Sequence, residues 1–586
     1  MEVHRKMKKI LSVILVICLM LAGFPALLVY GTAAELTYTG SKVPVILISG
    51  DGEAICDADG NTLLKFRDIT KVFSPDYDNG ETDVSGAAKN IISTLVEGYK
   101  TNDFSKYYDA VYEEISDLFR EIQLDKNGKP MNGTNISQRR RDTMEERFRR
   151  DAKLDKGYYG LEDYTFWYDW RLDPLTIADE LNTHIQRVKE VTGAKKVALV
   201  TRCLGTQVAL AYVAKYGTDD LHGLCFNGGT MNGAEPLSET ICGKFTIDGK
   251  AALRLLDDLR YFGILGDFDE FTDKTIDMLV KCGTIDAATQ AVKETLYKHI
   301  AQGATSAIAR ATFFGMPCYW GAVTEKDYEA AVNYVFGEEG SEKRVEYAGL
   351  IEKLDNYDRQ VRQRIPELLK ELDDSDCNVC VIAKYGAQMI PTCESMNLVG
   401  DQIISAKRAS FGATTSTIFD RLSDEYIEKQ TKAGLEKYIS PDKQIDASTC
   451  FWPDNTWFIK GVTHSNWTPF ECQLSYTVVT ADRQLTVDDF ENGQFTAAIP
   501  LRDANGNIRF DYAHDIMTCE YVKMTEDNCR LESWADDVDA EKNIFSKALD
   551  SFGAFARWFP LFMEKVMTFV NNIMKMVTDI VNNVRE

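Results

Sequence analysis

Cys203 is the residue whose type and setting point most directly to chemistry. It lies in the motif Thr-Arg-Cys-Leu-Gly of residues 201–205, between a short apolar run at 197–200 and a second apolar stretch with helical spacing at 208–216. A short apolar run bounded by a turn is typical of a buried parallel strand. A side chain at such a strand-turn-helix junction is raised above the sheet, at a helix N-terminus where backbone N–H groups stabilise negative charge. The motif therefore predicts a nucleophile elbow with a thiol at its centre, and a buried structural cysteine is the alternative.

The elbow motif departs from its usual form. Elbows of this kind normally read Gly-x-Ser-x-Gly, but here only the last glycine, Gly205, is present and Cys203 replaces the serine. A free cysteine, with a pKa of about 8.5, is mostly protonated at neutral pH, and a helix N-terminus or a paired histidine lowers that pKa. The position of Cys203 therefore predicts a thiolate that is formed before substrate binds.

A second loop with a candidate role follows the apolar run 43–48 and reads Ser-Gly-Asp-Gly at residues 49–52. In enzymes of the α/β-hydrolase fold, a loop at this place donates one backbone N–H to the oxyanion hole, and the residue after the nucleophile donates another. Asp51 and Leu204 are the predicted donors. The alternative is a plain turn, because Asp-Gly pairs are common turn formers.

Chain order predicts the acid and the base, because this fold places the nucleophile first, then an acid, then a histidine. Asp401 stands on a glycine turn after the strand-like run 379–384, and only two histidines follow it in the chain. His464 ends the strand-like segment 457–464 and is the predicted base. His514, in a later segment, is the alternative.

Several short blocks carry a family resemblance. Tyr-Asp-Trp-Arg-Leu at residues 168–172 lies one predicted helix before the elbow, Gly-Asp stands at 50–51, and Gly-Asp-Gln at 400–402 is similar to a Gly-Asp-Gly-x-Val acid loop that has lost its second glycine. In this order the blocks resemble the lecithin:cholesterol acyltransferase and lysosomal phospholipase A2 family of lipases. The resemblance covers scattered blocks between Val43 and His464, and it implies an α/β-hydrolase fold and an acyl ester substrate. Members of that family normally carry serine at the elbow, whereas the dienelactone hydrolases, another α/β-hydrolase family, use cysteine.

Composition excludes some classes of function. The chain has 586 residues, of which 45% are hydrophobic, so it is long enough to bury a large core. The formal net charge of −24 argues against nucleic-acid binding, which depends on clustered Lys and Arg. Cys377 and Cys380 have the spacing of half a zinc site, but no second half accompanies them, so neither a metal nor another cofactor is predicted.

The N-terminus has the pattern of a targeting segment. Four basic residues precede an apolar stretch at 10–29, and small residues follow up to residue 34. This pattern predicts a cleaved signal peptide at 1–34 and a secreted or extracytoplasmic protein. An uncleaved membrane anchor is the alternative, because the stretch approaches the length that spans a bilayer.

Hydrophobic periodicity predicts the division of the rest of the chain. The expected fold class is α/β, with a mostly parallel sheet of the α/β-hydrolase type, a helical cap, a small β-rich module and a terminal helix. A loop of the length between the predicted strands at 221–227 and 379–384 would be implausible without structure, and its helical patterns predict the cap. The segments are a first core part at 35–234 with a helical insertion at about 83–150, the cap at 235–376, a second core part at 377–470, the β-rich module at 471–540 and the terminal amphipathic helix at 541–586.

The last segment carries an apolar stripe with alternating spacings of four and three residues, from Phe545 to Val584. Such a stripe packs on the protein's own surface, on a second copy or at a membrane interface, and these three alternatives stay open.

Taken together, the motifs predict an exported lipase-like or acyltransferase-like enzyme that acts on an ester or thioester of an apolar acyl group through Cys203, His464 and Asp401. The alternative is a catalytically inactive binding protein of the same fold that retains an apolar ligand.

Overall fold

A seven-stranded sheet is the framework of the computed structural model. The structure describes residues 41–50, 54–64, 103–151, 159–244, 246, 315–504, 509–511 and 516–529, with single positions between 90 and 101 and between 251 and 258. All of them belong to one of the two units into which the chain divides by internal contacts, residues 1–266 and 292–536. Asp51, His514, the predicted signal peptide at 1–34 and the predicted helix at 541–586 lie outside the described residues.

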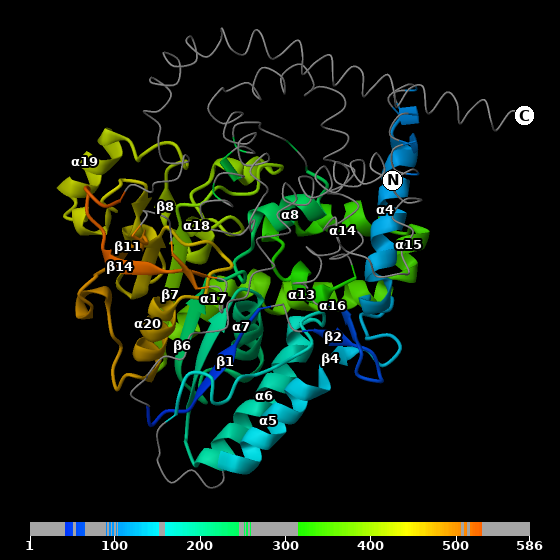
Figure 1. Ribbon diagram of the computed structural model, residues 1–586, viewed down its shortest axis with the longest axis horizontal. Helices are drawn as coiled ribbons and strands as arrows, with labels where there is room; N and C mark the ends of the chain where they lie inside the picture. The colour runs from blue at the N-terminus through cyan, green and yellow to red at the C-terminus, as the bar shows by residue number, and fades with distance from the viewer. Residues whose placement is uncertain are drawn as a thin grey trace, which may run out of the picture. The chain divides into compact units, whose positions relative to one another are not determined.

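The sheet is parallel except at one edge (Figure 1). Six strands pair in parallel, and the seventh pairs antiparallel with its neighbour. The mostly parallel sheet and its helices confirm the predicted α/β class. In order across the sheet the strands are β1 (Val45–Ile48), β5 (Val197–Arg202), β6 (Leu221–Asn227), β7 (Asn378–Tyr385), β10 (Thr456–Lys460), β11 (Phe495–Pro500) and β14 (Cys519–Lys523).

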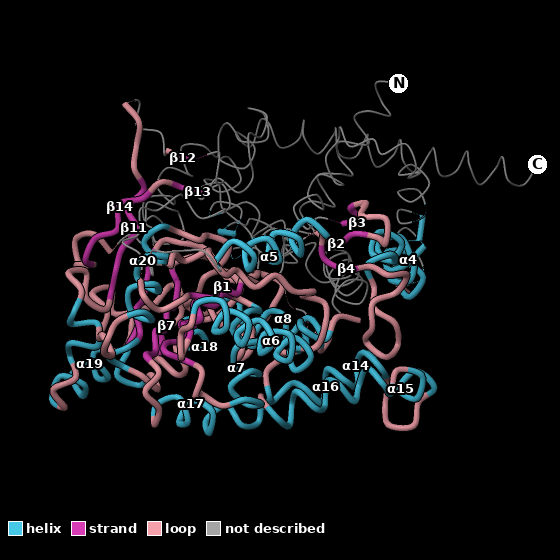
Figure 2. Tube along the Cα trace, turned by 90° about the horizontal axis from the view of Figure 1, so that it is seen from below, coloured by secondary structure: helices cyan, strands magenta, loops and turns pink. Residues whose placement is uncertain are grey.

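Both faces of the sheet are apolar, so both faces require a covering layer. In β5, Val197 and Leu199 belong to the hydrophobic cluster on one face, and Ala198 and Val200 belong to the cluster on the other. Figure 2 shows helices on the two sides of the strands. The first face is covered by α6 (Pro174–Thr192), α7 (Leu204–Tyr216) and α17 (Ile365–Asp373), and the second by α20 (Pro469–Thr480).

The described part of the predicted insertion at 83–150 is largely helical. It contains α4 (Ser105–Phe119) and α5 (Gln138–Asp151), with a small antiparallel sheet of β2 (Ile55–Cys56), β3 (Thr62–Leu64) and β4 (Asn135–Ile136) beside them. Arg171 fastens this region to the loop that precedes α6. Its buried guanidinium makes two hydrogen bonds to Asp169 and donates to the carbonyl oxygens of Ile122 and Thr134. The Tyr-Asp-Trp-Arg-Leu block at 168–172 is thus partly a structural clamp.

The described part of the predicted cap is helical, but its last helices pack beside the sheet. The helical pattern of the sequence from Val345 to Leu372 predicts one helix, but this segment is broken into several pieces. Of these, α16 and α17 both contact α7. The end of the predicted cap therefore contributes to the helical layer on the first face. The described helices between β6 and β7 are α8 (Glu235–Ile241), α13 (Pro317–Trp320), α14 (Tyr328–Phe336), α15 (Glu342–Glu346), α16 (Ala348–Gln360) and α17.

Within the predicted β-rich module, the alternating residues 476–480 predict a strand, and this prediction is wrong because they lie in α20. Thr468 begins that helix with a capping box, in which its hydroxyl accepts from the N–H of Glu471 and the Glu471 carboxylate accepts from the N–H of Thr468. The β-branched residues Val478 and Val479 are buried against the sheet. Tertiary burial and the cap thus outweigh their local preference for strands.

Residues 495–500, whose sequence also predicts a strand, form β11. Because β11 and β14 extend the main sheet, these two strands of the predicted β-rich module belong to the core. Among the described helices, none is long and apolar enough to cross a membrane. The remaining short elements are α18 (Ala406–Ala409), α19 (Asp424–Lys432), the pair β8 (Thr414–Thr415) and β9 (Ile445–Asp446), and the pair β12 (Phe510–Asp511) and β13 (Ile516–Met517).

Candidate active site

Cys203 occupies the sharp turn between β5 and α7, and its backbone is strained. Its φ is 50° and its ψ is −126°, a conformation that L-residues adopt only when their surroundings impose it. Its N–H donates to the carbonyl of Asn227 at 3.2 Å. Its carbonyl accepts from the N–H of Thr206 and from the hydroxyl of Thr230, both at 3.0 Å. These bonds hold the buried residue in the conformation that the sequence predicted for an elbow.

Gly205 explains why the last glycine of the motif is retained. A Cβ atom at this position would lie 2.4 Å from the carbonyl oxygen of Ile48 and 2.7 Å from that of Ser49. The first turn of α7 therefore touches the loop that leaves β1. Tyr168, from the Tyr-Asp-Trp-Arg-Leu block, donates its hydroxyl to the carbonyl of Ser49 at 2.6 Å. Both contacts fix the start of the loop that was predicted to complete the oxyanion hole.

Of the two predicted oxyanion donors, the structure describes one. Leu204 is buried and is the first residue of α7. Its N–H belongs to the first turn, where amide groups have no carbonyl partner within the helix. Asp51 lies outside the described residues, although the loop is described up to Gly50.

Asp401 and His464 lie in direct contact. The Nδ1 atom of His464 is 2.9 Å from Oδ2 of Asp401, and the N–H of His464 donates to the carbonyl of Asp401 at 2.8 Å. The other carboxylate oxygen accepts from the N–H groups of Ile403 and Ile404, at 3.1 and 2.8 Å. Asp401 is therefore held as a carboxylate, and it orients the imidazole with Nδ1 as the donor and Nε2 as the acceptor.

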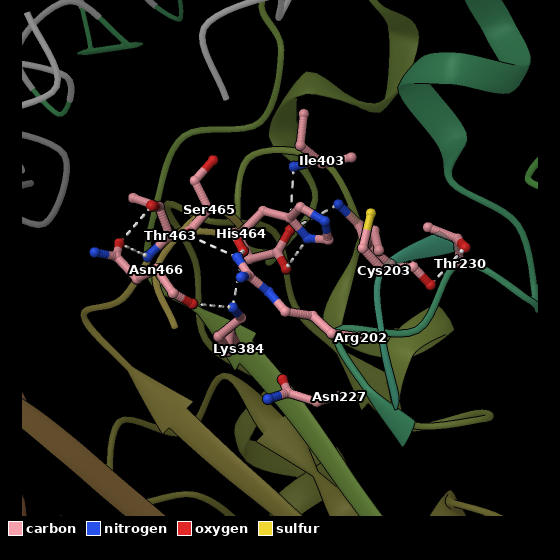
Figure 3. Close-up of polar contacts among 12 residues, drawn as sticks. Arg202, Cys203, Asn227, Thr230, Lys384, Ile403, Thr463, His464, Ser465 and Asn466 are labelled. Atoms are coloured by element: carbon pink, nitrogen blue, oxygen red, sulfur yellow. Dashed lines mark hydrogen bonds and ion pairs between the residues drawn. The ribbon is translucent and has the colours of Figure 1, made fainter. Parts of the chain in front are cut away.

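The third predicted residue belongs to the same corner of the sheet. Figure 3 shows Cys203 beside the His464 ring. A Cβ atom on Gly228 would lie 3.5 Å from Cε1 of His464, and the preceding residue, Asn227, accepts the N–H of Cys203. The Nε2 atom of His464 is buried and has no hydrogen-bond partner among the described residues. The structure thus brings Cys203, Asp401 and His464 together at this corner.

Two buried cations, Lys384 and Arg202, hold the histidine loop, residues 464–466, and lie below it in Figure 3. Neither of them was predicted from the sequence to lie in the site. Lys384 donates to the carbonyl oxygens of His464 and Asn466, both at 2.9 Å. Arg202 donates to the carbonyl oxygens of His464 and Ser465, at 3.0 and 2.6 Å. The sequence did offer a signal for Lys384, because it is the one charged residue of the predicted strand 379–384, which is otherwise apolar.

Lys384 is balanced by a buried carboxylate. Its ammonium lies 3.4 Å from Glu471, which is also the capping residue of α20 and accepts from Asn227 at 3.1 Å. Burial lowers the pKa of Lys384, and the Glu471 carboxylate opposes that effect. The pair links the strand before the acid loop to the helix after the histidine loop.

The surroundings of His464 favour a neutral imidazole. Burial is the main cause that lowers its pKa, Asp401 opposes the shift, and Lys384 and Arg202 reinforce it. Burial alone would raise the pKa of Asp401, but His464 and Lys384 hold it below its usual value. An imidazolium would be a third positive charge beside Lys384 and Arg202, so these two cations favour the neutral ring over the predicted pair of thiolate and imidazolium.

Cys377 and Cys380, which have the spacing of half a zinc site, are both buried. No disulfide joins two of the described cysteines. Cys380 and Cys225 are paired neighbours in β7 and β6, and burial, with the adjacent Cys380, raises the pKa of Cys225 well above its usual value. Within the described ranges, no group of three or more His, Cys, Asp or Glu residues is arranged to hold a metal.

Comparisons with protein-family models, with curated proteins and with solved structures found no match. The class that the structure itself defines is an α/β protein with a mostly parallel sheet, in which a cysteine, a histidine and an aspartate meet at the carboxyl ends of the strands.

Proposed function

We propose that this protein is an acyl hydrolase or acyltransferase of the α/β-hydrolase type, in which Cys203 is the nucleophile. The observation that carries the proposal is the strained Cys203 at the β5–α7 turn, beside a histidine whose Nδ1 bonds Asp401 and whose Nε2 has no partner in the described part of the chain. A nucleophile, a base and a group that orients the base are the parts that covalent acyl transfer requires.

The proposed reaction begins when the sulfur of Cys203 attacks the carbonyl carbon of an ester or thioester. His464 takes the thiol proton on Nε2 as the C–S bond forms. The carbonyl oxygen becomes an oxyanion, which accepts hydrogen bonds from the backbone N–H groups of Leu204 and Asp51. When the tetrahedral intermediate collapses, the bond to the leaving alcohol or thiol breaks and His464 returns the proton to it. Water or another alcohol then attacks the acyl-cysteine with His464 as the base, and Cys203 is released.

The electrostatics decide which version of cysteine chemistry we propose. Arg202 and Lys384 lie close enough to His464 to disfavour its protonation. We therefore assign His464 the role of a true general base, which removes the proton during the attack, as in serine enzymes. Asp401 remains charged throughout and stabilises the imidazolium that forms transiently.

We also propose that the chain has the α/β-hydrolase fold and that its substrate carries an apolar acyl group. The order of the three residues along the chain, with the acid after β7 and the histidine after β10, supports that fold. The resemblance of residues 168–172 to the lipases supports a lipid-like ester. Export through a signal peptide, and membrane-surface contact or self-association of the last segment, also remain proposals that rest on the sequence.

The test is turnover that depends on one thiol. We expect the mature protein to cleave p-nitrophenyl esters or thioesters of short and medium acyl chains, and Cys203→Ala to abolish cleavage. Cys519→Ala is the matched control, because this cysteine lies on the edge strand β14 and burial raises its pKa to about 12. Mass spectrometry after brief reaction with substrate should detect an acyl group on Cys203.

The competing function is that of a binding protein with the same fold. It would be favoured if no acyl donor were turned over, if no acyl-cysteine formed, and if an apolar ligand bound equally to the wild type and to Cys203→Ala. Cys203→Ser distinguishes the two further, because a serine beside a neutral base should retain activity in an enzyme and change nothing in a binder.

A further inference from the structure

Gln402, the residue after Asp401, combines two unfavourable features. Its φ is 91°, in the left-handed region that residues other than glycine rarely adopt. Its side chain is completely buried, yet neither Oε1 nor Nε2 has a hydrogen-bond partner among the described residues. Backbone strain and unsatisfied buried amide groups both destabilise a folded chain. Gln402 is therefore retained at a cost to stability.

The turn does not need a glutamine. Asp401 fixes it by donating its N–H to the carbonyl of Ile404 and by accepting the N–H groups of Ile403 and Ile404 on its carboxylate. The carbonyl of Asp401 accepts the N–H of His464, so the turn is fastened to the histidine loop. All of these bonds involve the neighbours of Gln402, and a glycine at its position would adopt the same φ without strain.

His464 carries another buried polar atom of this kind, and the proposed reaction explains it. Its Nε2 is also buried and without a partner among the described residues, and the proposed reaction supplies one, first from the thiol and then from the leaving alcohol. Gln402 directly follows Asp401, whose carbonyl accepts the N–H of His464, the base that passes its proton to the leaving alcohol in the proposed reaction. Its carboxamide offers one acceptor and one donor group, which a hydroxyl group satisfies by donating to Oε1 and accepting from Nε2.

We propose that the carboxamide of Gln402 binds a hydroxyl group on the alcohol part of the substrate. This inference rests on the proposed acyl-transfer function and names its substrate class, the esters of polyhydroxy alcohols. A site built to bond a hydroxyl group rejects the analogue that lacks it, because the buried amide is then left unpaired. An ester of a simple alcohol is accordingly a poor substrate.

The test compares two esters of the same acyl chain, propyl hexanoate and 1-hexanoylglycerol, whose three-carbon alcohols differ only in their hydroxyl groups. We expect the wild-type kcat/KM to favour the glycerol ester by roughly tenfold or more. Two variants should bring the ratio of kcat/KM for the two esters close to one. Gln402→Met keeps the size of the side chain and removes the amide, and Gln402→Gly removes the whole side chain. Their melting temperatures should be unchanged or higher, because each substitution removes one source of destabilisation.

The matched control is Lys443→Gly, which relieves a similar left-handed conformation (φ 61°) in a turn outside the proposed site. This variant should leave the preference for the glycerol ester intact. An unchanged ratio in both Gln402 variants would overturn the inference. A lower melting temperature in both would also overturn it, since it would show that the glutamine stabilises the fold.

A binding measurement separates this inference from the proposed function. In the Cys203→Ala background, calorimetry compares 1-O-hexylglycerol with hexyl propyl ether, neither of which contains a cleavable ester. A preference for the glycerol ether that disappears when Gln402→Met is added supports the hydroxyl site, even if neither ester is turned over and the acyl-transfer proposal fails. Turnover of esters without any such preference overturns the hydroxyl site alone.

Discussion

At the scale of single residues, the charges around His464 determine what its imidazole can do. Asp401 bonds Nδ1 and favours the protonated ring, whereas burial, Lys384 and Arg202 favour the neutral ring. The two cations also hold the backbone of the loop, because both donate to the carbonyl of His464. The same side chains therefore set the position of the base and its protonation state.

These contacts predict a particular pH dependence. Because the pKa of His464 is lowered, its neutral and active form persists below the ordinary histidine pKa of about 6.5, so the acid limb of kcat/KM should lie below that pH. The double variant Lys384→Met/Glu471→Gln removes a cation together with its buried partner and avoids an unpaired charge. Its acid limb should move to higher pH, because one group that disfavours the imidazolium is gone.

The measurement is a pH profile of kcat/KM for a p-nitrophenyl ester, with the melting temperature of each protein taken alongside. Loss of the two carbonyl bonds should also reduce kcat/KM roughly tenfold or more at the optimum. An acid limb that stays in place in the folded double variant would show that Lys384 acts only through structure.

At the scale of elements, close approach between backbones shapes the site. The first turn of α7 touches the end of β1 at Gly205, and α20 touches β6 at Gly223, where a Cβ atom would lie 2.3 Å from the carbonyl of Val479. These two contacts come from opposite faces of the sheet. They place the elbow and the capped helix of Glu471 at distances that only glycine permits.

Gly205→Ala tests this packing. The new methyl group would meet two backbone oxygens, of Ile48 and Ser49, which move only if the loop moves. We expect the free energy of unfolding to fall by about 1–3 kcal/mol and kcat/KM to fall by up to roughly a hundredfold, because the oxyanion donors are displaced. Gly160→Ala is the control, since its nearest contacts would be at an ordinary 3.7 Å. Equal urea midpoints and equal activities for both variants would contradict the prediction.

The elements also show what could be predicted from the sequence. The strand before Cys203 and the helix after it follow from local apolar spacing, and chain order was enough to select Asp401 and His464, which the structure brings together. Residues 476–480 were misread because alternating β-branched residues mimic a strand, whereas burial against the sheet and a capping box make a helix.

The bonds from Lys384 and Arg202 to the histidine loop could not be predicted either, and the reason is different. Lys384 and Arg202 reach carbonyl groups 80 residues and more away in the chain, and no local pattern encodes such contacts. The strain and the unpartnered amide of Gln402 are likewise properties of the folded turn. In both cases the sequence shows only a polar residue at an unexpected place.

At the scale of the whole molecule, the question is where the apolar stripe from Phe545 to Val584 is accommodated. The stripe lies outside the described residues, so its location remains a prediction from the sequence. Apolar positions at alternating spacings of four and three residues define one face of a helix. With a net charge of −24, the chain repels further copies of itself, which favours a partner surface within the same molecule.

We therefore predict that the stripe docks on the protein's own surface. Deletion of residues 545–586 should lower the melting temperature and increase the fluorescence of a dye that binds exposed apolar surface, because a contiguous apolar patch is uncovered. Light scattering should report a monomer both for the full-length protein and for the truncated one. A full-length dimer that becomes an equally stable monomer would instead assign the stripe to self-association. Binding of the full-length protein to lipid vesicles that is lost on truncation, with no change in melting temperature, would assign it to a membrane surface.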